Sequence, residues 1–417
     1  MAHFPNTVLN LILVTLAVKK TVENVFRKAG ITIRMRDDIA TVASTVAASA
    51  HAKPWDITVN NPRFFQRVIS DGLLGLGESY MDGDWDCERI DELAYKALIA
   101  GLDKRELHSW KDSLHFIRAK LTNLQTKHRS KKVAEQHYDI GNELYELMLG
   151  KYMAYSCGYW RPSETNPKGA KNLDEAQLAK LDLICRKLKF KPGDRVLEIG
   201  CGWGGFLAYA AKKYKISAVG ITLSKEQAAF AREKCKGLPV QILLQDYRDV
   251  VGKFDHVVSI GMFEHVGPKN YRQFMEVTRK ILKDDGLQML HTVGQHTSVI
   301  VNDAWTHKYI FPNSQAPSLA QIAHATEGIF HIEDHHVFGM DYYYTLHAWH
   351  DNFNAAWHEL QKVKKADGSP KYDERFRRMW HYYLMIAAGL AKSQKGTLFQ
   401  IVLSPSGAAG GYRAIRY

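Results

Sequence analysis

Two polar residues stand where buried strands are expected to end, and their chemistry suits proton transfer or the binding of an anion. Glu264 closes the apolar stretch 256–260, and His291 ends the stretch 288–292. A carboxylate and an imidazole that face one pocket can hold or move a proton. A single histidine at a strand end is more often a core residue whose hydrogen bonds are made within the protein. The two residues together, beside a ligand-binding turn, favour catalysis.

The expected ligand-binding turn is the glycine-rich segment Val196-Leu-Glu-Ile-Gly-Cys-Gly-Trp-Gly-Gly-Phe206. Because Gly200, Gly202 and Gly204 have no Cβ, the backbone can approach a ligand there and positive φ costs little. The spacing is E-x-G-x-G-x-G, whereas G-x-G-x-x-G sets a pyrophosphate at a helix N-terminus. It resembles the first motif of class I methyltransferases, which bind S-adenosylmethionine (SAM). A plain structural turn is the alternative, but a strand before it and a helix after it favour a SAM site.

The ends of the next two expected strands carry further candidates for this site. An Asp or Glu usually ends the second strand and takes the ribose hydroxyls; here Thr222 and Gln227 are the polar candidates instead. After the third strand, Asp246 could accept from the adenine amino group and Tyr247 could stack on adenine. Each could also be a helix cap or part of a surface loop. Their positions at matching strand ends indicate a site.

Four more stretches hold polar residues where apolar packing would be expected. They are His137-Tyr138-Asp139 with Gly141-Asn142, Tyr155-Ser156-Cys157-Gly158-Tyr159-Trp160, Gly261-Met-Phe-Glu-His-Val-Gly267 and Leu290-His-Thr-Val-Gly294. These stretches are therefore candidates for the same site.

The elements that position these residues are alternating strands and helices that begin near residue 191. The expected strands are Arg195–Gly200, Ser217–Thr222, Val240–Gln245, His256–Ile260, Gln288–Thr292, Phe330–Val337 and Phe399–Leu403. The expected helices are Phe206–Tyr214, Lys225–Lys234, Tyr271–Leu282 and Leu319–Thr326. The alternation predicts an α/β fold with a seven-stranded, mostly parallel sheet covered on both faces. Ligands in such sheets bind beyond the carboxyl ends of the strands.

The chain before residue 125 predicts a smaller, mainly helical N-terminal domain, and 417 residues suit two domains. Its helical patterns are Asn60–Arg67, Ile69–Met81, Ile90–Gly101 and His108–Leu124, and Arg34–Pro54 is expected to loop out. The apolar run Val8–Val18, continued to Ala29, predicts an amphipathic helix that is buried in its own domain, with membrane contact as the alternative. The run is shorter than the roughly 20 residues of a membrane span. It also lacks the basic segment that precedes a signal peptide's apolar core.

The net charge of +12 favours an anionic partner, either nucleic acid or the surface of an acidic membrane. A basic enzyme whose charge serves only solubility is the alternative. Basic residues gather before the α/β region, at Lys111, Arg118, Lys120, Lys127, Arg129, Lys131 and Lys132. A solvated helix face explains such a run equally well.

The five cysteines, Cys87, Cys157, Cys185, Cys201 and Cys235, show no C-x-x-C spacing and no accompanying histidine pattern. Neither a zinc site nor a disulfide framework is predicted. We therefore expect no metal, and a reducing, cytoplasmic compartment.

Two aromatic-rich stretches, 295–317 and 341–393, exceed what a minimal sheet requires. Their aromatic residues are Trp305, Tyr309, Phe311, Tyr342, Tyr343, Tyr344, Trp349, Phe353, Trp357, Phe376, Trp380, Tyr382 and Tyr383. Core packing explains most of them. Their position after the late strands also suits the wall of an apolar substrate cavity, so we expect lid insertions here.

From about Asn24 to its C-terminus the chain resembles the cyclopropane-fatty-acyl-phospholipid synthases, the group that includes mycolic acid cyclopropane synthases. The matching stretches are Gly75-Leu-Gly-Glu-Ser-Tyr-Met-Asp-Gly83, His137-Tyr-Asp-Ile-Gly-Asn142, Ser156-Cys157, Gly200-Cys-Gly-Trp-Gly-Gly205, Leu244-Gln-Asp-Tyr-Arg-Asp249, Gly261-Met-Phe-Glu-His-Val-Gly-Pro-Lys-Asn-Tyr271 and Lys308-Tyr-Ile-Phe-Pro-Asn313. Runs this long rarely coincide by chance.

The resemblance implies a Rossmann-like class I methyltransferase domain that transfers a methylene group from SAM to the cis double bond of an unsaturated phospholipid. The alkene attacks the sulfonium methyl, a carbocation forms, and a bound bicarbonate ion removes a proton before the ring closes. The implied bicarbonate ligands are Cys157, Glu264, His291, Tyr342 and the backbone of Val293. The SAM site would comprise Tyr155, Ser156, Gly200, Cys201, Gly202, Gly204, Thr222, Gln227, Asp246 and Tyr247.

The resemblance further implies a homodimer attached peripherally to the inner, cytoplasmic face of the membrane. Residues 1–125 would bind the lipid surface, and residues 126–417 would perform the chemistry. Some members of the family carry a cysteine where this chain has Ala387, so thiol catalysis is excluded at that position. The stretches 166–171 and 41–51 look like surface insertions.

Three other functions compete with this interpretation. A related methyltransferase that makes a methyl-branched lipid or methylates a small amine would share much of the site. A non-catalytic lipid-binding protein would not need a competent residue at every bicarbonate position. RNA methylation suits the charge, but the aromatic insertions suit an acyl chain better.

Overall fold

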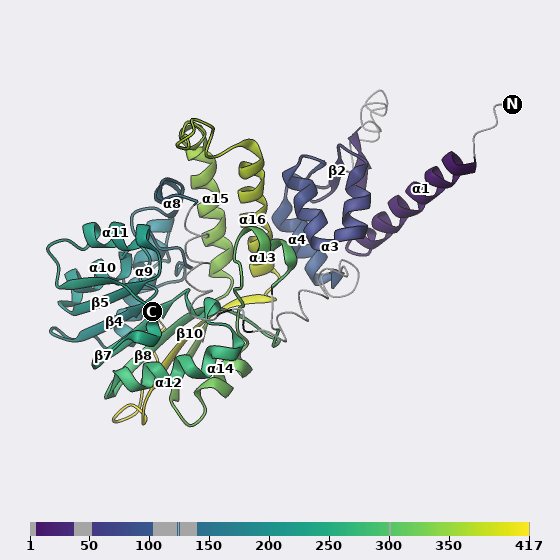
Figure 1. Cartoon of the computed structure of the whole chain (residues 1–417). Coiled ribbons are helices and arrows are strands. Elements are labelled where there is room, and N and C mark those ends of the chain that lie inside the picture. Colours follow the sequence, from purple (N-terminus) through teal and green to yellow (C-terminus); the bar gives the residue numbers. More distant parts are fainter. Residues whose placement is uncertain are drawn as a thin grey trace. The chain divides into compact units, whose positions relative to one another are not determined.

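The computed structural model describes residues 6–36, 52–102, 123, 125, 140–299 and 302–416 (Figure 1). The chain divides into two compact units, and each combines several stretches of sequence. The first comprises Met1–Arg118, Asp303–Ile310 and Gln361–Ser393; the second comprises Ala119–Asn302, Phe311–Leu360 and Gln394–Tyr417. The assignment of residues 1–125 and 126–417 to separate functions stays a prediction.

The second unit is built on a seven-stranded sheet with the order β6-β5-β4-β7-β8-β10-β9 (Figure 1). The strands are β4 (Arg195–Ile199), β5 (Ser217–Thr222), β6 (Val240–Leu244), β7 (Phe254–Ile260), β8 (Leu282–Gln295), β9 (His331–Val337) and β10 (Gly396–Ser404). The five neighbouring strands β6, β5, β4, β7 and β8 run parallel, and β10 is antiparallel to β8 and β9. The predicted sheet is confirmed. β8 begins at Leu282, earlier than the predicted start at Gln288. The polar run Lys283–Asp285 hides the apolar pattern there, so the sequence did not reveal this part of the strand.

Helices cover both faces of this sheet. On one face lie α9 (Leu173–Lys187), α10 (Gly205–Tyr214) and α11 (Lys225–Lys234), and on the other lie α12 (Tyr271–Ile281) and α14 (Leu319–Thr326) (Figure 1). Val196 packs into the first layer and its neighbour Leu197 into the second, because successive side chains of a strand point to opposite faces. The four predicted helices of the α/β region are confirmed. Two more helices of this unit are α8 (Asn142–Leu149) and α15 (Asp341–Leu360).

Side-chain caps fix where several of these helices begin. Asn172 accepts from the Glu175 amide at the start of α9, and Ser224 accepts from the Gln227 amide at the start of α11. Ser318 and Gln321 form a capping box at α14. Such caps satisfy backbone donors that a helix leaves unpaired at its N-terminus.

The first unit combines helices with a small sheet. Its helices are α1 (Asn6–Arg27), α3 (Arg63–Met81), α4 (Ile90–Ile99), α13 (Ala304–Tyr309) and α16 (Glu374–Lys392), and its sheet has the order β1 (Ile33–Met35), β2 (Ile57–Val59), β3 (Trp85–Asp86). Sequence patterning missed this sheet, since strands of two or three residues carry no readable alternation. β1 therefore corrects the start of the loop expected at 34–54. The two helical patterns at 60–67 and 69–81 form one helix, α3, with a kink at Gly72.

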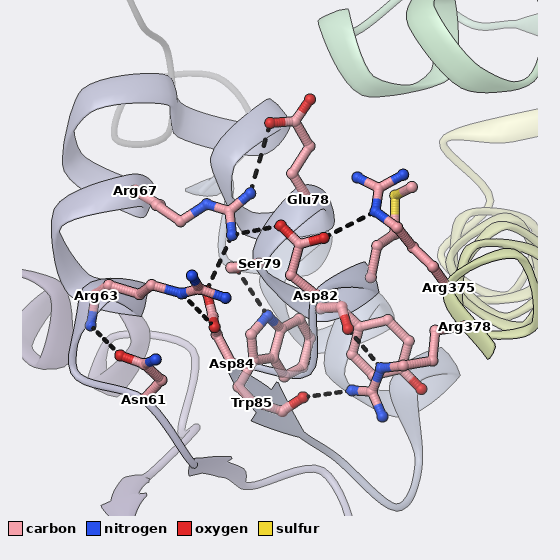
Figure 2. Close-up of polar contacts among 12 residues, drawn as sticks. Asn61, Arg63, Arg67, Glu78, Ser79, Asp82, Asp84, Trp85, Arg375 and Arg378 are labelled. Carbon is pink, nitrogen blue, oxygen red and sulfur yellow. Dashed lines mark hydrogen bonds and ion pairs between the residues drawn. The ribbon is translucent and has the colours of Figure 1, made fainter.

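The sequence stretch Gly75–Gly83 contributes to an ion-pair network within this unit (Figure 2). Arg67 Nη1 pairs with Asp82 at 2.8 Å and with Asp84 at 3.0 Å, and Arg375 Nε pairs with Asp82 at 2.8 Å. Since the Asp84 side chain is only 1% exposed, its pairing offsets the cost of burying a carboxylate. The motif thus joins α3 to α16.

Several aromatic residues of the predicted insertions form the core of the first unit. A Cβ on Gly77 would lie 2.3 Å from the Trp305 ring, so glycine is required for this contact. Trp305 also packs edge-on against Tyr382, with ring centroids 4.7 Å apart. For these residues core packing, rather than a cavity wall, is the arrangement found.

No helix among the residues that the structure describes is long and apolar enough to cross a bilayer. The predicted N-terminal helix is confirmed as α1, and its Val22 and Phe26 are buried. The basic residues between Lys111 and Lys132, and the stretch 137–139, lie outside the described residues.

Candidate functional site

The glycine turn follows β4 and begins α10, as predicted. Gly200, Gly202 and Gly204 all have positive φ, at 81°, 51° and 78°. A Cβ on Gly200 would lie 2.7 Å from Met262, and one on Gly204 would lie 3.1 Å from Ala231, so both flanks of the turn are packed. A Cβ on Gly202 would meet nothing within 4 Å. The turn therefore exposes its backbone at Gly202, where a ligand can approach.

The carboxyl ends of β5 and β6, which follow β4 in the sheet order, carry four more of the predicted SAM residues, Thr222, Gln227, Asp246 and Tyr247. Thr222 Oγ1 donates to Gln227 Oε1 at 2.9 Å, and both residues are buried. Asp246 accepts from Arg248 Nε at 2.7 Å and from its Nη2 at 2.8 Å. Tyr247 is buried and packs against the ring of Phe274. Their contacts with ribose and adenine stay predictions, and Asp246 would have to accept an adenine hydrogen while paired with Arg248.

Glu264 lies just beyond β7 and reaches the next strand. Its Oε1 accepts from the backbone amide of Val293 in β8 at 2.7 Å, while its Oε2 has no hydrogen-bond partner among the residues that the structure describes. Burial raises the pKa of Glu264 to about 7, against the lowering effect of backbone and Thr292 hydrogen bonds. A carboxyl group that is partly protonated near neutral pH can either donate or accept a proton there.

His291 lies in β8 opposite Gln400 of β10. The amide nitrogen of Gln400 faces His291 Nδ1 at 3.1 Å, so Nδ1 accepts and the proton of the neutral ring lies on Nε2. Nε2 itself has no partner in the described part of the chain, and the residue is 1% exposed. Burial, with the charges of Lys180 and Lys187, places the pKa of His291 well below its usual range. The ring is thus a neutral donor with one free N–H.

The loop that carries Tyr155, Ser156 and Cys157 passes between helices α9 and α15. Cys157 is fully buried, and its thiol donates to the Gly158 carbonyl at 3.2 Å. Burial raises the pKa of this thiol well above its usual value, so it is no thiolate nucleophile. Tyr342 lies in the first turn of α15 and packs against the hydrophobic cluster that contains Cys157.

An aromatic group adjoins this loop. The Tyr155 ring lies 5.3 Å from Tyr145 and 5.2 Å from Trp349, and Tyr342 lies edge-on to Trp349 at 6.2 Å. Trp203 of the glycine turn completes the group, 4.8 Å from Tyr145. Tyr342 and Trp349 belong to the predicted insertion 341–393, and their role in a cavity wall stays a prediction. Aromatic faces of this kind can stabilise a nearby cation.

The chain matches the family model described as mycolic acid cyclopropane synthetase over residues 125–401. It is 50% identical over 363 residues to the cyclopropane-fatty-acyl-phospholipid synthase of Escherichia coli (strain K12), a match that covers 87% of this chain and 91% of that protein. The chain belongs to this cyclopropane synthase family. It is also 35% identical over 352 residues to a probable fatty acid methyltransferase of Pseudomonas putida, covering 79% of this chain and 81% of that one.

Solved structures agree with membership of the cyclopropane synthase family. The cyclopropane synthase MmaA2 of Mycobacterium tuberculosis is 26% identical, with a TM-score of 0.58, and covers 68% of this chain and 99% of its own. The mycolic acid cyclopropane synthase CmaA1, solved with SAH and CTAB, is 26% identical, with a TM-score of 0.57 and 66% and 97% coverage. Coclaurine N-methyltransferase, at 20% identity and a TM-score of 0.64, covers 79% of this chain and 98% of its own and shows the shared fold alone. The predicted class I SAM methyltransferase fold is confirmed.

Three residues that surround this synthase site escaped the sequence reasoning. They are Gln177 and Lys180 on α9, and Gln400 in β10. Each is buried, and a buried polar side chain requires a partner. Only Gln400 stands in an apolar stretch, 398–403, where its polarity was a readable signal, because α9 carries charged residues along its whole length. The partner itself could not be read from the sequence, since it lies far away along the chain.

All five cysteines lie in the described part of this synthase. All five thiols are free. Among residues 6–36, 52–102, 123, 125, 140–299 and 302–416, no group of three His, Cys, Asp or Glu side chains is placed to hold a metal ion. Ala387 lies in α16, within the first unit.

Proposed function

We propose that this enzyme transfers a methylene group from SAM to the cis double bond of unsaturated phospholipid acyl chains, and so forms a cyclopropane ring. The observation that carries the proposal is the 50% identity, across 87% of the chain, to a cyclopropane-fatty-acyl-phospholipid synthase. When bound, SAM supplies the methyl carbon that the alkene attacks, and bicarbonate supplies the base that takes one proton from that carbon before ring closure. S-adenosylhomocysteine and the protonated base are the other products.

The residues at the carboxyl ends of the strands fit a small anion in chemical type. His291 Nε2 and Glu264 Oε2 are buried polar atoms without a partner in the described ranges, and a bound anion would satisfy both. The neutral His291 ring can donate its N–H to an anion. Glu264, with its pKa raised to about 7, can donate as the acid or accept the bicarbonate hydrogen as the carboxylate. We infer that Cys157 and Tyr342 complete the anion site.

The chain's other contribution is to exclude water from the positive charge that develops on the acyl chain. Water would trap that charge as an alcohol. The aromatic group of Tyr145, Tyr155, Trp203, Tyr342 and Trp349 supplies apolar faces that can stabilise the cation without reacting with it.

We also propose that Tyr155, Ser156, Gly200, Cys201, Gly202, Gly204, Thr222, Gln227, Asp246 and Tyr247 bind SAM. The open space above Gly202 supports the position of the ligand. The enzyme would act at the inner face of the membrane as a homodimer. The net charge of +12 supports attraction to an anionic bilayer, in which the acyl chains are found.

Lipid mass analysis tests the reaction directly. Purified enzyme, SAM and vesicles of unsaturated phospholipid should yield acyl chains that gain one CH2 and lose the alkene signal. A lipid that gains CH2 but keeps its double bond would instead favour methyl branching. That second candidate has one observation in its favour: the chain is 30% identical over 294 residues to sphingolipid C9-methyltransferase 2 of Gibberella zeae, although it covers only 54% of that protein.

A further inference from the structure

Helix α9 buries four polar side chains: Asp182 and Lys187 form ion pairs with Lys213 and Asp334, whereas Gln177 and Lys180 contact a loop. Gln177 is fully buried and Lys180 is 1% exposed. Because the two are three residues apart, their side chains are neighbours on the helix surface. Ala176 and Leu183 beside them are apolar and buried.

Both side chains bind Ser156, and Gln177 Nε2 also lies 3.4 Å from the Ala154 carbonyl oxygen. Gln177 Nε2 donates to the Ser156 carbonyl oxygen at 2.8 Å, and Lys180 Nζ donates to Ser156 Oγ at 2.8 Å. The backbone and the side chain of Ser156 are therefore held from one turn of α9. The loop also runs against this helix, since a Cβ on Gly158 would lie only 2.9 Å from Ala176 Cβ.

Helix α15 holds the same loop from another side. Thr345 Oγ1 accepts from the Gly158 amide at 3.0 Å and from the Trp160 indole at 2.9 Å. Asp341 accepts from the Trp160 amide at 2.7 Å. Cys157 thus follows a residue fixed by α9 and precedes residues fixed by α15, so the loop has little freedom to move.

The contacts that Lys180 makes in the fold do not explain why a charged side chain is buried at this position. Its one hydrogen-bond partner within the described part of the chain is a neutral hydroxyl, and no carboxylate there lies within ion-pair distance. Replacing such a buried charge by an apolar side chain of similar shape is often neutral or stabilising. The field of the ammonium instead reaches Cys157, Glu198 and His291, which are residues of the methyltransferase site or its glycine turn.

The direction of the Lys180 hydrogen bond decides what Ser156 can do. An ammonium group only donates, so Ser156 Oγ accepts from it and keeps its own hydrogen for another acceptor. Ser156 lies beside Gly261, the residue that follows β7: a Cβ on Gly261 would be 3.8 Å from Ser156 Cβ. Its hydroxyl donor is therefore at the carboxyl edge of the sheet, where ligands of this fold bind.

We propose that Gln177 and Lys180 are positioning residues of the methyl-donor site, which hold Ser156 so that its hydroxyl donates to the carboxylate of the amino-acid part of SAM. The identity of that ligand rests on the proposed function. Gln177 fixes the backbone of the loop, and Lys180 fixes the hydroxyl and adds a positive charge behind it. A carboxylate gains from both the donor and the charge.

The test measures binding of S-adenosylhomocysteine to the full-length protein by calorimetry. Lys180→Met keeps the shape of the side chain and removes its charge, so we expect at least tenfold weaker binding with an unfolding midpoint no lower than that of the parent. Ser156→Ala should lose a similar factor, and the double variant should lose no more than either single one, because both remove the same contact. In steady state, the KM for SAM should rise while the KM for lipid stays unchanged.

The control weakens α9 without touching Ser156. Asn172 caps this helix by accepting from the Glu175 amide at 2.9 Å. Asn172→Ala should therefore lower the unfolding midpoint but leave the affinity for S-adenosylhomocysteine unchanged. A loss of affinity equal to that of Lys180→Met would mean that any weakening of α9 has this effect, and would overturn the proposal.

Unchanged affinity in folded Lys180→Met would also overturn it. If that variant does not fold, Gln177→Met removes the other contact with Ser156, and unchanged affinity there is equally decisive. The binding measurement separates this proposal from the reaction itself. A wild-type protein that binds S-adenosylhomocysteine but makes no cyclopropane lipid would refute the reaction alone.

Discussion

The backbone amide of Val293 donates its hydrogen to Glu264 Oε1 over 2.7 Å. The family resemblance implied that the backbone of Val293 binds the anion. The backbone N–H of Val293, however, already donates to Glu264. The remaining donors at the strand ends are His291 Nε2–H and, in the acid form of Glu264, its Oε2–H; both atoms are buried and neither has a partner among the described residues. A protonated Glu264 also removes a difficulty, because a neutral acid does not repel an anion as a carboxylate would.

Removing either of these groups should affect turnover far more than SAM affinity. We expect Glu264→Gln and His291→Ala each to lower kcat by at least about 100-fold, in the range of general acid–base contributions, with SAM binding changed by less than threefold. Depleting dissolved carbonate should slow the wild type, and added bicarbonate should restore its rate.

The competing mechanism makes Glu264 itself the base, since burial has already raised its pKa to about 7. In that case carbonate-free buffer would leave the wild-type rate unchanged, while Glu264→Gln would still be inactive. The rate measured with and without bicarbonate therefore decides between the two bases.

The same carboxyl group should make stability depend on pH. The pKa of Glu264 is raised from 4.5 to about 7 by folding, so the folded state binds more protons between these values. Its contribution to stability is fully present below about pH 4.5 and is lost as the pH rises through about 7. Glu264→Gln should match the parent at pH 5 and exceed it at pH 9 by on the order of 3 kcal/mol in free energy of unfolding. Equal stability of the two proteins at pH 9 would show that Glu264 is not buried as an acid.

The sequence predicted the strands and the turn that carry the site better than it predicted the residues that hold the site side chains in place. Short apolar runs that alternate with helical segments revealed all seven strands of the large sheet, and hence that Glu264 and His291 lie at one edge. Glu198, Gly200, Gly202 and Gly204 identified the turn, because their spacing is set by the backbone itself. These features are local in sequence.

What the sequence could not give depends on contacts between distant residues. Gln400 lies opposite His291 only because β10 inserts antiparallel between β8 and β9. Lys180 meets Ser156 only through the packing of α9 against the loop. Similarly, the segment with Trp305 folds with Gly77 of the first unit, and no periodicity in either stretch announces this contact.

The glycine turn offers a test of the SAM site with a matched control. Gly202 and Gly237 both have positive φ, at 51° and 76°, and a Cβ on either would meet nothing within 4 Å. A valine at either position should therefore cost roughly 1–3 kcal/mol of backbone strain. Only Gly202→Val would also fill the space that SAM needs. Calorimetry should show SAM binding lost in Gly202→Val and retained in Gly237→Val, whereas equal affinity in both folded variants would remove the turn from the site.

Attraction to the membrane should depend on the basic run that precedes the α/β region. Changing Arg129, Lys131 and Lys132 to Gln should weaken binding to anionic vesicles roughly 100-fold, since each cation near such a surface contributes about 1 kcal/mol. Changing the exposed Lys362, Lys364 and Lys365 to Gln lowers the net charge equally and serves as the control. Co-sedimentation at low and high salt measures both sets. Equal losses would mean that overall charge, not this run, drives attachment.

Two buried glutamines of the sheet provide the sharpest test of how His291 is oriented. Gln400 faces His291 Nδ1 at 3.1 Å, whereas neither amide atom of Gln288 in β8 has a partner within the part of the chain that the structure describes. Gln400→Leu should let the His291 ring change tautomer and turn, and so lower kcat at least tenfold with little effect on SAM affinity. Gln288→Leu makes the same chemical change in the same sheet but removes only an unsatisfied amide. It should keep full activity and raise the free energy of unfolding by about 1 kcal/mol. Steady-state kinetics and urea unfolding of the pair give the answer: if both variants lose activity alike, a buried glutamine matters only for packing, and the proposed role of Gln400 fails.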